Sequence, residues 1–135
     1  MMTSVNRRQL ICLTILSSIT LVLFLGLTPF STRGEPREAV VAMSMLQQDN
    51  WVLPVNNGDE IPFKPPFLHW LVAAFSSVAG GISVLTSRLP SALGTLCLVV
   101  ATYLFFARRR DSHTAFAAAL ILLTNFEVHR SAVTC

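Results

Sequence analysis

Charge is scarce in this chain, and lysine is almost absent from it. Only 13% of the 135 residues are charged, whereas 53% are hydrophobic. A typical soluble domain is more charged and less apolar. Lys64 is the one lysine, beside nine arginines and seven acidic residues. The composition therefore favours an integral membrane protein over a soluble globular domain.

Cysteine is also too rare and too scattered to define a site. Cys12, Cys97 and Cys135 fall within or at the end of apolar runs, and no two of them are close in sequence. An odd number of cysteines without short spacing indicates neither a disulfide framework nor a metal motif. P-loop, dinucleotide-binding and Ser-His-Asp patterns are likewise missing. The simplest interpretation makes the three thiols small residues buried in a membrane.

Long apolar runs, by contrast, are present, and we expect three membrane spans. Residues 9–27 carry no formal charge over nineteen residues, about 28 Å of helix against a hydrocarbon core of ~30 Å. A secretory signal peptide is the alternative, but this run exceeds a signal core and no clean cleavage site follows it. Further spans are expected over 88–107 and 113–135, and the third is expected to be cut short at the end of the chain.

The basic residues give these spans an orientation. Residues 1–8 hold Arg7 and Arg8, and residues 108–112 hold three consecutive arginines. Because cytoplasmic flanks of membrane spans are enriched in arginine and lysine, both groups are expected in the cytoplasm. A nucleic-acid patch is the disfavoured alternative, so no nucleic-acid partner is expected. Residues 28–87 then form an outer loop.

The outer loop is expected to hold two juxtamembrane helices, over about 36–48 and 66–79. The first has apolar residues at helical spacing after Pro36, and the second is apolar but too short to span a membrane. Between them, a hairpin over residues 51–63 would present Lys64 beside Pro65 and Pro66, which stiffen the chain.

The sequence does not decide the role of two polar features of this loop. Asn57, Asp59 and Glu60 could bind a divalent cation or a sugar, although a solvated turn is favoured. His69 is more simply an interfacial aromatic than a metal ligand, because no second histidine or cysteine has suitable spacing. No metal site is assigned, and a divalent cation is the only cofactor considered.

Several separated motifs, in this loop and at the start of the second span, are similar to those of one enzyme family. In order they are G-E-P-R from Gly34, M-L-x-x-x-x-W-V-x-P, an N-G turn, F-K-P-P-x-x-x-W around Lys64, and S-R-L-P-S-A-L around Arg88. Together they resemble the N-terminal part of the polyprenyl-phosphate-dependent membrane glycosyltransferases. That family includes the bacterial lipid A aminoarabinose transferases and the protein O-mannosyltransferases.

The resemblance implies an all-α membrane protein with a C-type glycosyltransferase fold. Enzymes of this kind transfer a sugar from a polyprenyl-phosphate donor to a lipid A, protein or glycan acceptor. The site would face the periplasm from the bacterial inner membrane, with membrane lipids around it and the N-terminus in the cytoplasm. Two departures stand out: Gly34 replaces the first acid of the family's Asp-Glu pair, and Phe63 replaces an acid common before the lysine.

The resemblance also assigns candidate residues. Glu35 is the candidate catalytic base, since a carboxylate can deprotonate an acceptor hydroxyl, although it could equally cap the helix that follows. Lys64 is the candidate ligand of the donor phosphate, against the alternative of an interfacial lysine that reaches to the headgroups. Arg37 and Arg88 could add to the same positive pocket, or pair with Glu38 or with lipid headgroups.

Two functions remain open at this stage. The first is the N-terminal part of such a glycosyltransferase, with the 135 residues expected to be inactive alone. The second is a non-catalytic three-span membrane protein whose outer loop binds lipid or a partner subunit. This second function stays open because Gly34 and Phe63 depart from the family pattern.

Overall fold

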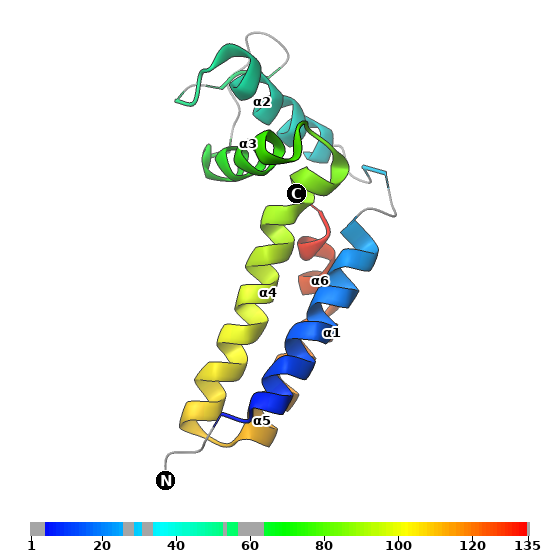
Figure 1. The fold of residues 1–135 in the computed structure, drawn as a ribbon, viewed down its shortest axis with the longest axis vertical. Coiled ribbons are helices and arrows are strands. Elements are labelled where there is room, and N and C mark those ends of the chain that lie inside the picture. Colours follow the sequence, from blue (N-terminus) through cyan, green and yellow to red (C-terminus); the bar gives the residue numbers. More distant parts are fainter. Residues whose placement is uncertain (1–4, 26–28, 31–33, 53, 57–63, 135) are drawn as a thin grey trace. The chain divides into compact units, whose positions relative to one another are not determined.

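The regular structure of the described chain is entirely helical. The computed structural model describes residues 5–25, 29–30, 34–52, 54–56 and 64–134, and within them it has six helices and no β-strand. This confirms the all-α class over those residues. The helices are α1 Arg7–Leu25, α2 Gly34–Gln48, α3 Phe67–Ala79, α4 Val84–Arg109, α5 Ser112–Thr124 and α6 Phe126–Ala132 (Figure 1).

The chain divides into two compact units. The first unit comprises Met1–Phe24 and Ala92–Val133, and the second comprises Leu25–Ser91 with Thr134–Cys135. The second unit therefore holds α2, α3 and the beginning of α4. The assignment of residues 28–87 to an outer loop stays a prediction.

Small residues allow the helices of the first unit to pack closely. Its buried cluster draws on α1, α4 and α5, which lie side by side (Figure 1), and three of its members are alanines. Small side chains let helix backbones approach, which is the common solution for helices in membranes. The buried cluster consists of Leu13, Val99, Tyr103, Ala107, Ala115, Ala119 and Leu123.

Tyr103 adds one polar contact at the edge of this cluster. Its hydroxyl accepts a hydrogen bond from the Asn6 backbone N–H at 3.1 Å. The Asn6 carbonyl at 3.1 Å and the Gln9 side-chain oxygen at 3.2 Å are both within reach of the hydroxyl proton. The buried phenol is therefore satisfied, and it ties the start of α1 to α4.

Among the described helices, α4 is the one that is long and apolar enough to cross a membrane. Its 26 residues amount to about 39 Å of helix. Large apolar side chains are also exposed on α1, where Ile15 is 54% and Val22 65% exposed. Exposed apolar surface of this kind indicates contact with lipid or other protein. The second span is thus supported by length and composition, whereas the first and third remain predictions.

The third apolar run is divided at Asn125. Its first helix, α5, has 13 residues, about 20 Å and shorter than a hydrocarbon core. Asn125 then ends α5 in an extended conformation, and its side-chain oxygen accepts hydrogen bonds from the N–H groups of Glu127 and Val128 at the start of α6. The apolar pattern over 113–135 predicted one continuous helix and did not reveal this break, because an asparagine cap acts locally.

Protonation of Asp111 should loosen the start of α5 only at low pH. The Thr114 hydroxyl, the Thr114 N–H and the His113 N–H donate to this carboxylate and lower its pKa from 3.8. The pKa of Asp111 is therefore lower in the folded state than in the unfolded state. The ionised carboxylate stabilises the fold fully at a pH above the unfolded-state pKa, and this stabilisation is lost as the pH falls through the folded-state pKa. Amide exchange at His113 and Thr114 in detergent micelles should therefore accelerate only below about pH 3.8.

The control is Asp111→Asn, which keeps a side-chain acceptor at every pH. Its amide protection should not change across the acidic range, whereas Asp111→Ala should lose protection even at neutral pH. An Asp111 carboxyl that titrates at or above the ordinary aspartate value would contradict this account of the cap.

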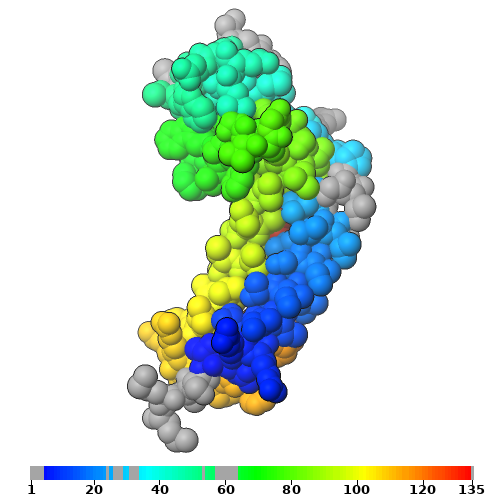
Figure 2. Space-filling view, viewed as in Figure 1, coloured from blue at the N-terminus to red at the C-terminus, as the bar shows by residue number. Residues whose placement is uncertain are grey.

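The second unit is built on α2 and α3, which pack directly against each other (Figure 2). Ala42, Val72 and Ala73 form the buried contact between them. Gly80 ends α3 in the left-handed region, with φ at +82°, where a side chain would strain the backbone. Both helices occupy the expected positions, although α2 begins two residues earlier than predicted, at Gly34.

Candidate functional site

Glu35 and Arg88 form a buried ion pair in the second unit. Glu35 lies in the first turn of α2, and Arg88 lies in the second turn of α4. The guanidinium Nε is 2.8 Å from Oε1 and Nη2 is 3.2 Å from Oε2. Both side chains are fully buried. This two-pronged arrangement is the geometry in which arginine binds a carboxylate most strongly.

Arg88 also binds the backbone between α1 and α2. Its Nη1 donates to the Leu25 carbonyl at 3.2 Å, and its Nη2 donates to the Pro29 carbonyl at 3.0 Å. The Leu25 carbonyl is at the C-terminal end of α1, where carbonyls lack helical partners. One side chain thus joins the end of α1 and the start of α2 to α4.

A second cluster follows one helical turn later on α2. The Glu38 side chain is only 4% exposed, and its Oε1 lies 2.8 Å from Lys64 Nζ. Its Oε2 lies 2.5 Å from His69 Nε2. Lys64 has a side chain that is 58% exposed, whereas the His69 side chain is fully buried. The carboxylate therefore separates a buried imidazole from an ammonium group that faces outward.

His69 is unusual among the described residues because it is buried without an ideal partner. Its Nε2 is close to Glu38 but is not aligned for a regular hydrogen bond, and its Nδ1 has no hydrogen-bond partner among the residues described. Buried polar atoms are usually paired, so an unpaired imidazole nitrogen calls for a functional or solvent-based explanation. An interfacial aromatic, as predicted for His69, would not be fully buried.

The predicted site residues fall into two groups. Glu35 and Arg88, expected as base and phosphate ligand, are joined to each other. Lys64 is held separately by Glu38, and Arg37 is exposed on α2. The two oxygens of Glu35 are both occupied by Arg88, so neither is open to an acceptor hydroxyl in this arrangement. The roles assigned to Glu35 and Arg88 stay predictions that require this pair to open.

Sequence reasoning did not assign Glu38 and His69 to the site. The sequence offers Glu38 only as an ion-pair partner for Arg37 or Arg88. A usable signal existed, because Glu35 and Glu38 are three residues apart and so share a face of α2. The contact with His69, which is 31 positions further along the chain, depends on how α2 and α3 pack.

Hydrogen bonds from Trp70 and Ser44 help to hold the described part of the connection between α2 and α3. The Trp70 indole N–H donates to the Trp51 carbonyl at 2.7 Å, and the Ser44 hydroxyl lies 2.7 Å from the Val55 carbonyl. The segment that follows α2 is thereby fixed to both helices. The second arm of the expected hairpin, with Asn57, Asp59 and Glu60, lies outside the described residues.

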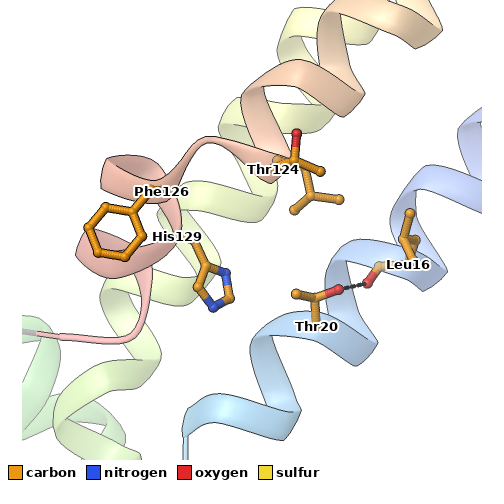
Figure 3. A pocket seen from close by; sticks show the side chains of 6 residues that line it. Leu16, Thr20, Thr124, Phe126 and His129 are labelled. Carbon is orange, nitrogen blue, oxygen red and sulfur yellow. Dashed lines mark hydrogen bonds between the residues drawn. The ribbon is translucent and has the colours of Figure 1, made fainter.

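A separate groove of about 380 Å³ lies in the first unit, between α1, α5 and α6. The imidazole of His129 points from α6 towards α1 (Figure 3). The hydroxyl of Thr20 is bonded to the Leu16 carbonyl of its own helix, at 2.8 Å, which leaves a largely apolar wall. Within the described residues, no group of three or more metal-ligating side chains gathers here or elsewhere.

Three curated bacterial proteins are similar to this chain, and each is named undecaprenyl phosphate-α-4-amino-4-deoxy-L-arabinose arabinosyl transferase. The Pseudomonas savastanoi protein is 32% identical over 91 residues, which cover 67% of this chain and 17% of its own length. The Shewanella sediminis protein is 30% identical over 104 residues, with coverages of 77% and 19%. The Pseudomonas fluorescens protein, numbered 2 in its name, is 33% identical over 104 residues, with coverages of 73% and 18%.

This chain therefore spans less than a fifth of the length of the relatives it matches. No protein-family model matches it, and no solved structure does. The chain is thus similar to a short segment of proteins that are named aminoarabinose transferases. The protein O-mannosyltransferase part of the resemblance finds no counterpart among these three relatives.

Proposed function

We propose that this chain is the N-terminal part of a membrane glycosyltransferase that takes its sugar from a polyprenyl-phosphate donor. The names of the three relatives support undecaprenyl phosphate as the lipid and an aminoarabinose-type sugar as the cargo. The observation that carries the proposal is Lys64, an exposed ammonium held by a buried carboxylate beside two prolines.

The chemistry explains why a cation is needed there. An oxygen of the acceptor attacks the anomeric carbon of the sugar, and the bond from that carbon to the donor phosphate oxygen breaks. The phosphate leaves with the bonding electrons, so a fixed positive charge stabilises the transition state. In this proposal Lys64 binds that phosphate and Arg37 assists from α2. Glu35 accepts the acceptor proton once its pair with Arg88 opens, which would also let Arg88 reach the phosphate.

The proposed setting is the outer face of the bacterial inner membrane. A lipid A, protein or glycan hydroxyl on that side would be the acceptor. Because the relatives are more than five times longer than the matched region, most of the acceptor site would lie in sequence that this chain does not contain. We therefore propose that residues 1–135 alone have no transferase activity.

The direct test is sugar transfer by the complete protein in lipid nanodiscs. Undecaprenyl phosphate carrying a radiolabelled 4-amino-4-deoxy-L-arabinose would be offered with lipid A, and the same assay would be run with residues 1–135. We expect transfer by the complete protein and none by the shorter chain. The proposal fails if the complete protein binds the donor but transfers no sugar from any undecaprenyl-phosphate donor to any of the acceptor classes.

That outcome would favour a non-catalytic protein whose outer loop binds lipid or a partner subunit. One structural observation favours this second function: Gly34 has no carboxylate, and the carboxylate of Glu35 is fully buried against Arg88. A protein of this kind would bind undecaprenyl phosphate through Lys64 without turning over the donor.

A further inference from the structure

We propose that Glu38 and His69 are positioning residues for Lys64, and that they act together as a buried anchor for its ammonium group. This inference rests on the proposed phosphate-binding function of Lys64. It assigns a role to two residues that neither the sequence motifs nor the comparisons single out.

The exposure of the three side chains increases from His69 through Glu38 to Lys64. His69 is fully buried, Glu38 is 4% exposed and Lys64 is 58% exposed. A phosphate can therefore approach Lys64 from the open side while Glu38 remains behind it. The ammonium has three donors, so it can keep its contact with Oε1 and still donate to a phosphate oxygen.

His69 determines which way the Glu38 carboxylate faces. Its Nε2 lies 2.5 Å from Oε2, which leaves Oε1 directed at Lys64 at 2.8 Å. The two helices that carry these residues pack through a buried apolar contact, so neither partner moves freely. A lysine side chain loses much conformational freedom when it binds a ligand, and an anchor that orders it beforehand reduces this cost.

The cost of burying His69 supports a role beyond packing. A fully buried imidazole needs a polar neighbour, and within the described residues the Glu38 carboxylate lies in contact with its Nε2. In the part of the chain that the structure describes, the charged groups next to this imidazole are Glu38 on α2 and, beyond it, Lys64 before α3. Glu35, which is paired with Arg88 of α4, lies one turn earlier on α2. We therefore infer that His69 is buried because its Nε2 contacts Glu38.

The experiment measures the Kd of undecaprenyl phosphate for the complete protein by titration calorimetry in detergent. His69→Leu and Glu38→Gln should each weaken binding about tenfold, because each removes a contact that holds the Lys64 ammonium group in place. His69→Gln should stay within about twofold of the original protein, because its amide N–H can replace the imidazole donor. Glu127→Gln, which removes an exposed carboxylate of the first unit, is the charge-matched control and should have no effect.

The decisive comparison repeats these variants in a Lys64→Met background. If Glu38 and His69 act through Lys64, neither substitution should weaken binding further once the ammonium is gone. An equal further loss in that background would overturn the inference. If His69→Leu does not fold, Glu38→Gln, which keeps the size of the side chain, allows the same comparison of Kd with and without Lys64.

Transfer kinetics separate positioning from chemistry. The His69 and Glu38 variants should lower kcat/KM for the donor about tenfold when Lys64 is present and should have no further effect in the Lys64→Met background, whereas an equal loss in both backgrounds would overturn the positioning role. If Lys64→Met itself leaves the Kd unchanged, the proposed function fails first. If Lys64→Met weakens binding but His69→Leu and Glu38→Gln do not, only the present inference fails.

Discussion

Arg88→Met should destabilise the protein by about 3–5 kcal/mol, the usual cost of leaving one partner of a buried ion pair without the other. The substitution removes the arginine that binds the fully buried Glu35 carboxylate. It also removes the donors to the Leu25 and Pro29 carbonyls. Thermal unfolding of the complete protein in detergent would measure the loss. Arg88→Lys should recover only part of the stability, because an ammonium group cannot bind both carboxylate oxygens in a fork.

Two controls separate the ion pair from a general effect of lost charge. Arg130→Met breaks the exposed pair with Glu127, and it should cost less than about 1 kcal/mol. The double variant Glu35→Leu with Arg88→Met removes both charges together and should be more stable than Arg88→Met alone. If Arg88→Met unfolds at the original temperature and only raises the KM for the donor, Arg88 is a phosphate ligand and not a structural connection.

Lys64→Ala should lower kcat/KM for sugar transfer roughly 10²–10³-fold, which is typical for removal of one group that stabilises developing negative charge. The side chain is more than half exposed, so the substitution removes a ligand contact and little packing. Steady-state transfer in nanodiscs by the complete protein would measure the effect. Lys64→Arg should retain part of the activity, since the charge is kept while the shape of the donor group changes.

Arg130→Ala again serves as the control, because it removes an exposed cation of the first unit and should leave kcat/KM unchanged. Unfolding temperatures of the Lys64 and Arg130 variants should both match that of the original protein. Full transfer activity in a correctly folded Lys64→Ala protein would contradict the role of this residue in donor binding.

Much of the helical framework could be predicted from the sequence because run length and breakers act locally. The apolar stretch before the three arginines predicted the long helix α4, and the short apolar run over 66–79 predicted α3. The division of the third run was missed. Its apolar residues continue up to Phe126, and only the side chain of Asn125, bonded to two backbone N–H groups, starts a new helix there.

The candidate site was harder to predict, since its contacts join distant parts of the chain. The sequence drew attention to Glu35, Lys64 and Arg88 one by one. It could not reveal that Arg88, 53 positions after Glu35, binds both oxygens of that carboxylate. Nor could it show that Glu38, which it offered only as a partner for an arginine, holds Lys64 and His69 together. Such pairs depend on tertiary packing, for which a single sequence carries no direct signal.

The central claim is that Lys64 holds the phosphate of an isoprenoid lipid, and native mass spectrometry of the complete protein purified from its membrane tests it most directly. We predict that an undecaprenyl phosphate, with or without a sugar, co-purifies with the original protein and is lost from Lys64→Ala while bulk phospholipids remain. The absence of any polyprenyl phosphate from the original protein, or its undiminished retention by Lys64→Ala, would contradict the account.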